Sequence, residues 1–242
     1  MSTNEKTTNG NVFSVLEIIS NYRIPLTLTW FFRGLLLSQE VRILTVFQDS
    51  AEFRSCDISR IPPHEDCCVQ LHHELFEKPV KAHLYHRSLD NCTFVLSDFC
   101  YDLRSWTDRL LDRLQPKSFT RVSSCVNHIR VDGSCLDLNA RGIGFLVKKK
   151  SYPNDQILPG SNIHMDFALS SKYSWKKLEG TVIHISPISR LLFRIGVLLQ
   201  PNPNEAIKLE KYNSQRKEEI LAELSLAFFR ASEPPQVKDL YF

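Results

Sequence analysis

The chain has 242 residues, of which 43% are hydrophobic and 24% charged, and its formal net charge is +3. These ordinary values exclude a largely disordered chain and leave room for one large domain or two modest ones. The charge is divided unevenly: residues 1–115 carry 12 Lys and Arg against 15 Asp and Glu, and residues 116–242 carry 18 against 12. The basic second part suits an anionic ligand, although such a surplus is also common on solvated surfaces.

Seven cysteines are spread along the chain without a CxxC pair, and their odd number does not form a secretion-type disulfide framework. The first residues lack the apolar core of a signal peptide, and Arg33 interrupts the most apolar stretch, between Pro25 and Leu37. We therefore expect reduced thiols, a cytoplasmic location and no membrane insertion.

The first half of the chain has the pattern of a short helix followed by strands. Apolar residues from Val12 to Ile19 have helical spacing, which predicts a helix over 12–20. After Pro25, six segments have the composition and alternation of strands: 26–31, 41–47, 51–56, 67–71, 80–86 and 92–99. Strands in succession without intervening helices favour an antiparallel barrel or sandwich.

The middle of the chain changes to a helical period. Leu103, Trp106, Leu110 and Leu114 fall on or near one helical face, and Pro116 ends the pattern. We predict a helix here and place the domain boundary beside it.

The second half returns to strands. Alternation runs from Cys125 through Val131, and Asp132–Gly133 has the composition of a tight hairpin turn. Further strands are expected from 134 towards 137, at 143–147, 162–169, 180–185 and 192–199. A closing helix is expected from Gln215 to Arg230, with Ser214 as its N-cap.

Residues 136–147 combine short polar side chains with glycines at the start of a strand. Asp137 and Asn139 precede Gly142, after which apolar residues alternate with Gly144 and Leu146. Backbone without side chains beside a carboxylate and an amide suits a flat ligand that forms hydrogen bonds. The same residues also suit a simple turn at the start of a strand, because loops use Asp, Asn and Gly for turns.

A second motif lies upstream, where Lys117-Ser118-Phe119-Thr120-Arg121 places two cations four residues apart. In this order and spacing, the two motifs resemble the R-x-x-x-R and [D/N]-x-S-x-x-G motifs of the PilZ domain, the bacterial receptor module for cyclic di-GMP. The resemblance covers roughly residues 112–202 and includes the segment Arg194–Val197, which resembles the closing strand of PilZ barrels. Each motif is degenerate on its own, and their combination is more specific.

The resemblance implies roles for the cations and for the residues of the second motif. Arg121 would bind a guanine edge or a phosphate with its planar fork, with Lys117 as the partner cation. Asp137 would accept hydrogen bonds from guanine N1–H and N2–H. Asn139 stands where the family has serine, and Lys117 stands where it has arginine, so both positions depart from the family pattern.

Two further residues complete the implied site. Gly142 would let the ligand approach the backbone, and Arg141 is an additional cation beside it. For the set Lys117, Arg121, Asp137, Asn139, Gly142 and Arg141, the alternative is a solvated basic linker followed by a turn.

The N-terminal half resembles, through order and pattern rather than a motif, the companion domain of flagellar-brake proteins of the YcgR type. We therefore expect a mainly β chain with two antiparallel β-barrels and short helices at the N-terminus, in the linker and at the C-terminus. The expected divisions are a YcgR-like barrel at 11–114, a PilZ domain at 115–205, and a helix and tail at 206–242.

The function implied is that of a non-catalytic receptor, with cyclic di-GMP as ligand and no cofactor. Ligand binding would change the arrangement of the domains and act on an unidentified protein partner, in a monomer or homodimer that binds no nucleic acid polymer. One alternative is a degenerate PilZ protein that binds no nucleotide and works through protein contacts alone.

A metal-dependent enzyme is the other alternative, based on His64, Cys67, Cys68, His72 and His73. Adjacent cysteines on a strand point to opposite faces, and recognised zinc spacings need paired ligands that this stretch lacks. Because the sequence also has no nucleophile elbow, phosphate loop or metalloprotease motif, we expect neither a metal site nor an enzyme.

Overall fold

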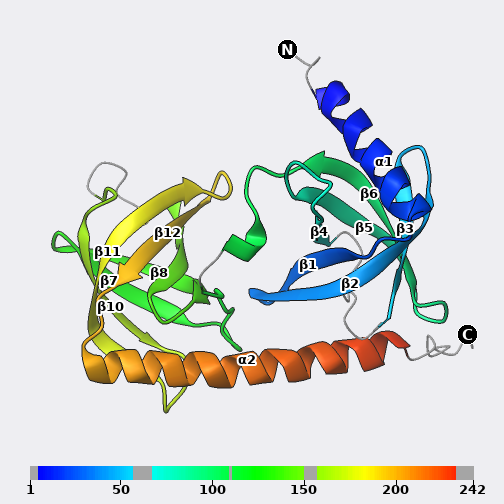
Figure 1. The fold of residues 1–242 in the computed structure, drawn as a ribbon. Coiled ribbons are helices and arrows are strands. Elements are labelled where there is room, and N and C mark those ends of the chain that lie inside the picture. The colour runs from blue at the N-terminus through cyan, green and yellow to red at the C-terminus, as the bar shows by residue number, and fades with distance from the viewer. Residues whose placement is uncertain (1–4, 57–66, 109–110, 150–156, 233–242) are drawn as a thin grey trace, which may run out of the picture. The chain divides into compact units, whose positions relative to one another are not determined.

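The computed structural model describes residues 5–56, 67–108, 111–149 and 157–232 and contains two closed, antiparallel, six-stranded barrels (Figure 1). In the first, the strands follow the order β1-β2-β3-β6-β5-β4 around the barrel, and in the second the order is β10-β11-β12-β9-β8-β7. The predicted fold class, mainly β with two antiparallel barrels, is confirmed.

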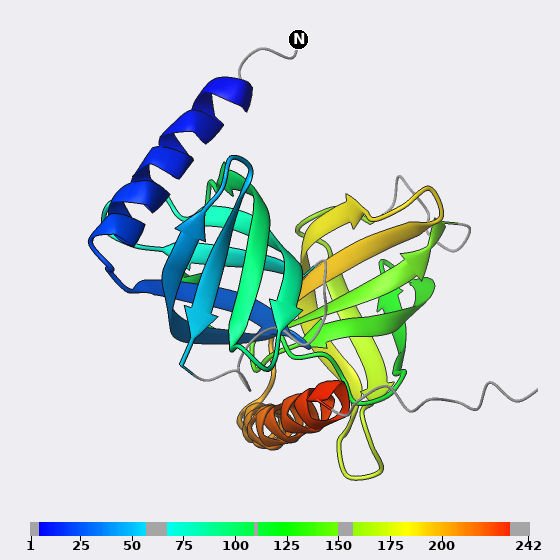
Figure 2. The ribbon, with the colours of Figure 1, turned by 90° about the vertical axis from the view of Figure 1, so that its right-hand side faces the viewer.

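The first barrel comprises β1 (Leu26–Phe32), β2 (Leu35–Val46), β3 (Ser50–Ser55), β4 (Cys68–His72), β5 (Val80–Ser88) and β6 (Thr93–Tyr101). Helix α1 (Glu5–Asn21) precedes it and lies against it (Figure 2). Val12, Leu16 and Ile19 of this helix are fully buried in the core of the barrel, because their helical spacing puts them on one face.

The second barrel comprises β7 (Arg121–Val126), β8 (Ile129–Leu138), β9 (Gly142–Lys148), β10 (Asn162–Ala168), β11 (Ser174–Pro187) and β12 (Leu192–Leu199). Strand β10 is buried at every second residue, so Ile163, Met165 and Phe167 fill the interior while the residues between them face outwards. The outward positions of β8, β9 and β12 form the surface on which the candidate site lies.

The hairpin turn between β7 and β8 was predicted at Asp132–Gly133, and this prediction was wrong. The chain turns at Asn127 and His128, whose φ angles are +49° and +70°, as a two-residue hairpin turn requires. Gly133 instead lies within β8, where a Cβ would come within 2.5 Å of the carbonyl oxygen of Leu146. Its lack of a side chain serves close strand packing.

The predicted helix over 103–114 was also wrong for the residues that the structure describes. The segment contains one 3-10 turn, η2 (Trp106–Asp108), and Leu103 is exposed. Buried Gln70 binds the backbone of this segment instead: its amide donates at 2.9 Å to the Arg104 carbonyl, which a helix would pair internally, and its oxygen accepts from Trp106 N–H at 2.8 Å. Tertiary hydrogen bonds thus replace the helical ones.

Helix α2 (Pro203–Ser232) begins twelve residues earlier than the predicted start at Gln215. Asn202 is its N-cap, since the Asn202 side chain accepts from Glu205 N–H at 3.0 Å and the Glu205 carboxylate accepts from Asn202 N–H at 2.9 Å. This reciprocal pair with Pro203 behind the cap defines a helix start. Ser214 lies inside the helix and caps nothing, which corrects that prediction too.

The chain divides into two compact units. One contains residues up to 32, 36–110 and 221 onwards, and the other contains residues 33–35 and 111–220. The boundaries at 114/115 and 205/206 remain predictions. Among the described residues, no helix combines the length and apolar character needed to cross a membrane.

Candidate functional site

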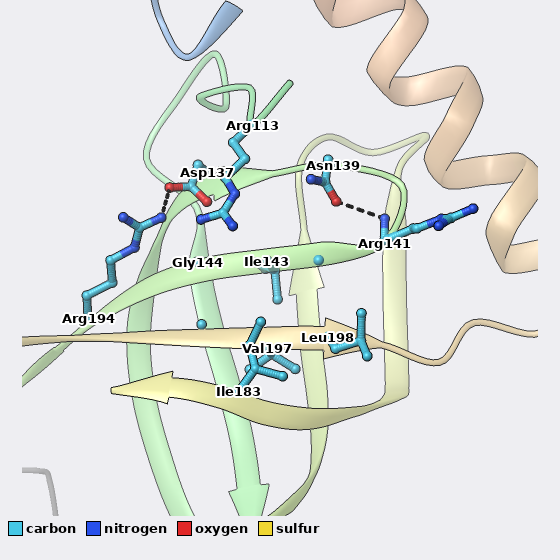
Figure 3. A pocket seen from close by; sticks show the side chains of 12 residues that line it. Arg113, Asp137, Asn139, Arg141, Ile143, Gly144, Ile183, Arg194, Val197 and Leu198 are labelled. Carbon is cyan, nitrogen blue, oxygen red and sulfur yellow. Dashed lines mark hydrogen bonds and ion pairs between the residues drawn. The ribbon is translucent and has the colours of Figure 1, made fainter. Parts of the chain in front are cut away.

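A hollow of about 140 Å³ opens on the outer face of the second barrel, across β8, β9 and β12 (Figure 3). Strand β9 points Ile143, Phe145 and Val147 into the core, so Gly142 and Gly144 face outwards. Glycine at these outward positions leaves bare backbone as the floor. A flat group can approach the sheet there as it could not over larger side chains.

The floor continues across the neighbouring strands because of their register. Gly144 lies opposite Asp137 of β8 on one side and opposite Gly196 of β12 on the other. A Cβ on Gly144 would lie 2.7 Å from Oδ1 of Asp137 and 3.2 Å from Nη2 of Arg194. The carboxylate and the guanidinium therefore lean directly over this glycine, and an alanine there would displace them.

Asp137 and Arg194 form an ion pair at one end of the hollow, with 2.5 Å between Oδ2 and Nη2. Both side chains are largely buried, at 14% and 26% exposure. Arg194 stands two residues before Gly196 on β12, which puts both on the outer face. A charge-assisted hydrogen bond in partial burial fixes the orientation of the carboxylate.

Asn139, Arg141 and Gly142 form the turn that closes the other end. The Asn139 side-chain oxygen accepts from Arg141 N–H at 2.9 Å, and Asn139 N–H donates to the Gly142 carbonyl at 2.8 Å. This is the local hydrogen bonding that suits asparagine to a turn. With its oxygen engaged, Asn139 offers its NH₂ group to a ligand.

Arg113 reaches the hollow from the segment that precedes the second barrel. Leu114 and Leu138 are joined by two backbone hydrogen bonds of 2.9 Å as an isolated antiparallel bridge. Antiparallel register then places Arg113 across from Asn139. Figure 3 shows the Arg113 guanidinium beside Asp137, directed towards Gly144.

An apolar flank completes the lining. Ile183 of β11 and Leu198 of β12 border the hollow and are about half exposed, at 53% and 45%. Aliphatic side chains beside a bare backbone floor give a flat ring an apolar surface to cover. Together with the Asp137 carboxylate and the guanidinium groups of Arg113 and Arg194, this flank suits a nucleotide whose base donates N–H hydrogen bonds and whose phosphate is anionic.

Of the six site residues predicted from the motifs, some line the hollow in the structure and others do not. Asp137, Asn139, Arg141 and Gly142 all line the hollow, whereas Lys117 and Arg121 are not among the residues that line it. Lys117 is 70% exposed with Nζ 4.0 Å from the Glu219 carboxylate.

Arg121 is engaged by a carboxylate of its own barrel. Its Nη2 lies 2.8 Å from Oδ2 of Asp132, in an exposed pair. The hydrogen bond from Arg121 holds the pKa of Asp132 below its usual range, with help from Ser123 and Arg130. Both motif cations are therefore paired with acidic residues in this structure.

Arg113, Arg194 and Gly144 were not predicted as site residues. Arg113 lies four residues before Lys117, the same spacing that separates Lys117 from Arg121, so the cation pattern extends one step upstream. Arg194 has no local signal, since it is 57 residues from Asp137 in the chain. Only the strand register brings the two together.

Cys135 lies next to the site without offering a nucleophile. Burial raises the pKa of its thiol to about 12, and the nearby Asp137 carboxylate acts in the same direction. A thiol that stays protonated at neutral pH neither attacks nor binds metal readily. Cys135 is thus not an activated nucleophile beside the hollow.

The His64–His73 cluster is only partly described, because His64 lies outside the described residues. Burial raises the pKa of both Cys67 and Cys68 and lowers that of His72. Within the described part of the chain, no three His, Cys, Asp or Glu side chains are grouped so as to hold a metal ion.

No protein-family model and no curated protein matches the sequence. Solved structures do match. YcgR from Escherichia coli in complex with c-di-GMP is 13% identical, covers 88% of this chain and 92% of its own, and has a TM-score of 0.43. The K. pneumonia MrkH–c-di-GMP complex is 13% identical, covers 90% and 97%, and has a TM-score of 0.44.

A shorter match covers about half of the chain. The PilZ domain of E. coli YcgR with c-di-GMP is 12% identical, covers 48% of this chain and 96% of its own, and has a TM-score of 0.41. The matched structures thus include YcgR and its PilZ domain, the type of protein that the two motifs and the pattern of the N-terminal half were found to resemble.

Proposed function

We propose that this chain is a non-catalytic receptor for cyclic di-GMP that binds the nucleotide on the outer face of the second barrel. The observation that carries the proposal is the hollow in which Asp137 is fixed over the bare backbone of Gly144, with Arg113 beside it. Asp137, Asn139 and Gly142 of the second motif all line this hollow.

The chemistry of the hollow matches one guanine. Its N1–H and N2–H groups are donors that a carboxylate accepts, and Asp137 is held in place for this by Arg194. Guanine N7 and O6 are acceptors that an arginine fork grips together, and a phosphate accepts the same fork. Arg113 is the cation placed to make these contacts, whereas the Arg141 guanidinium points away from the hollow (Figure 3).

The proposed consequence of binding is a change in the relative arrangement of two domains, taken as 11–114 and 115–205 with the helical tail 206–242. A ligand shifts a conformational equilibrium only through its different affinity for the two states. Contacts from both the linker and the barrel provide such a difference. The receptor would act in the cytoplasm on a protein partner in motility, exopolysaccharide or biofilm control.

Titration calorimetry with cyclic di-GMP tests the proposal, with cyclic di-AMP as the matched control ligand. We expect micromolar or tighter binding of cyclic di-GMP and at least tenfold weaker binding of cyclic di-AMP, because adenine lacks the N1–H donor. Asp137→Asn should remove the preference, since it replaces an acceptor with a donor. Equal binding of both dinucleotides, or wild-type affinity in Asp137→Asn, would contradict the site assignment.

A second candidate is favoured by one specific observation. Lys117 and Arg121 are paired with Glu219 and Asp132 rather than lining the hollow. A PilZ protein that binds no nucleotide and works only through protein contacts fits that arrangement. Absence of binding by wild type, together with absence of binding by Lys117→Arg, which restores the family's arginine, would select this candidate.

A further inference from the structure

The segment that carries Arg113 is held between the end of β8 and helix α2. On one side Leu114 is paired with Leu138 and is itself buried, at 1% exposure. On the other side two successive residues of α2, Arg216 and Lys217, bind the segment. Arg113 therefore sits in a stretch of chain whose neighbours on both sides are fixed.

Arg216 makes the central contact. Its side chain is 1% exposed, its Nε donates to the Gln115 carbonyl at 2.8 Å, and its Nη1 lies 3.2 Å from the Glu219 carboxylate. Burying a guanidinium is costly unless its donors are satisfied. The buried charge therefore binds the segment and Glu219 at once, and displacing the Gln115 carbonyl would leave a buried donor unpaired.

Lys217 makes the contact on the other side of Arg113. Its Nζ lies 2.6 Å from Oδ2 of Asp112. Asp112 precedes Arg113 directly and Gln115 follows it by two residues, so α2 holds the backbone before and after the arginine. Contacts on both sides of Arg113 fix the point from which its side chain starts, beside the hollow.

Helix α2 is itself docked firmly at this level of the chain. Leu209 is fully buried and Tyr212 nearly so, both in the core of the second barrel. Lys208 donates to the Ser174 carbonyl at 2.6 Å and lies over the Trp175 ring. The helix is thus a fixed support against which the segment is held.

We propose that Arg216 is a positioning residue for the nucleotide site, which holds residues 112–115 so that the Arg113 guanidinium stays over the glycine floor. This inference rests on the proposed function, because it names Arg113 as the arginine that contacts cyclic di-GMP and α2 as the helix that positions Arg113. Coupling is reciprocal, so bound ligand must in turn strengthen the hold of α2 on the linker. Helix α2 then becomes the element through which binding is sensed.

The identity of residue 216 is important in this arrangement. Arginine presents a planar fork that serves a carbonyl and a carboxylate at the same time, and lysine offers a single ammonium on a flexible stem. Arg216→Lys keeps the charge near Glu219 and loses the Nε donor to Gln115. It is the smallest change that releases the segment.

A double-mutant cycle tests the coupling by titration with cyclic di-GMP. We expect Arg113→Ala and Arg216→Lys each to weaken binding about tenfold, a typical coupling between linked sites. The double variant should bind no more weakly than Arg113→Ala alone, because Arg216 acts through Arg113. Effects that add in the double variant would overturn the proposal.

The matched control is Lys208→Met on the same helix. It removes a hydrogen bond from α2 to the Ser174 carbonyl, away from the linker. Wild-type affinity is expected for Lys208→Met. A loss of affinity equal to that of Arg216→Lys would contradict the proposal, because any contact of α2 would then have the same effect as Arg216.

Asp112→Asn provides a second linker variant if Arg216→Lys fails to fold. It weakens a partly exposed ion pair, and its effect on binding should depend on Arg113 in the same way.

A measurement without ligand separates failure of this inference from failure of the proposed function. Hydrogen exchange at the Leu114 and Leu138 amides reports the bridge directly. We expect faster exchange at both in Arg216→Lys, and unchanged exchange at both would overturn the positioning role. If the wild type binds no cyclic di-GMP but exchange at these amides is faster in Arg216→Lys, the proposed function is wrong, while the role of Arg216 in holding the linker is supported.

Discussion

Arg194 and Asp137, on strands β12 and β8, face each other across Gly144, with 2.5 Å between guanidinium nitrogen and carboxylate oxygen. Strand β9 lies between them and has glycine at position 144, so the two side chains can meet above its backbone. This contact orients the carboxylate that is proposed to read guanine.

Arg194→Met should weaken cyclic di-GMP binding at least tenfold and lower the free energy of unfolding. A largely buried carboxylate loses one charged hydrogen-bond partner, and the loss of such a bond costs about 1–3 kcal/mol. Calorimetric titration and urea unfolding measure the two effects. The double variant Asp137→Asn with Arg194→Met should recover part of the stability, since the carboxylate charge is then removed together with the guanidinium.

Gly144→Ala tests the bare floor. A Cβ there would lie 2.7 Å from Oδ1 of Asp137 and must push the carboxylate out of place. Binding should fall by at least tenfold while the barrel stays folded. Gly196→Ala is the matched control, because its nearest neighbour atom would lie 3.5 Å away, an ordinary contact. Equal losses in the two variants would show that the hollow's width matters and the carboxylate does not.

Alternation of apolar and polar residues was sufficient to predict most strands. Strand β12 was predicted with its observed ends, whereas β2 and β11 each begin six residues before their predicted starts at 41 and 180. The turn at Asn127–His128 was missed because Asp-Gly is the stronger local turn signal, while Gly133 is glycine for contact with Leu146. A single sequence does not distinguish these two uses of glycine.

Only the local part of the site was accessible from the sequence. Asn139 and Gly142 belong to one turn and Asp137 lies at the end of the strand that leads into it, so their spacing predicted that they would lie together. Arg194 joins them through register alone, which a linear motif does not encode. Arg113 was missed because it lies in a segment with helical spacing, and this spacing does not reveal that Leu114 pairs with Leu138.

Replacing the three linker cations one by one ranks their roles. Arg113→Ala should weaken cyclic di-GMP binding more than Arg121→Ala or Lys117→Ala, because Arg113 alone among the three lines the hollow. A bidentate arginine contact is worth about 1–3 kcal/mol, or about ten- to a hundredfold in affinity. Titration of the three variants measures the order. A larger loss in Arg121→Ala would mean that ligand draws Arg121 away from Asp132.

Thiol labelling compares two cysteines of the second barrel. Cys125 is exposed, whereas Cys135 is partly buried with a pKa raised to about 12. Because the thiolate is the reactive form, Cys135 should react with an aromatic disulfide reagent much more slowly than Cys125. Mass spectrometry after timed labelling measures both rates. Comparable rates would show that the β8 strand opens readily beside Asp137.

Tyr212 makes the docking of α2 sensitive to alkaline pH. Burial raises the pKa of its phenol from 10.0 to about 12. In the unfolded chain the phenol ionises near pH 10, whereas in the folded chain it stays neutral to about pH 12, so the unfolded state releases its proton first. The contribution of Tyr212 to the free energy of unfolding is therefore fully present below pH 10 and is lost progressively as the pH rises towards 12.

Urea unfolding as a function of pH measures this loss. Tyr212→Phe should lose less stability between pH 10 and 12 than wild type, and Tyr85→Phe, at a 70% exposed position, should lose as much as wild type. Identical pH profiles for Tyr212→Phe and wild type would show that the phenol is solvated, and that α2 is held to the second barrel by Leu209 and the linker contacts instead.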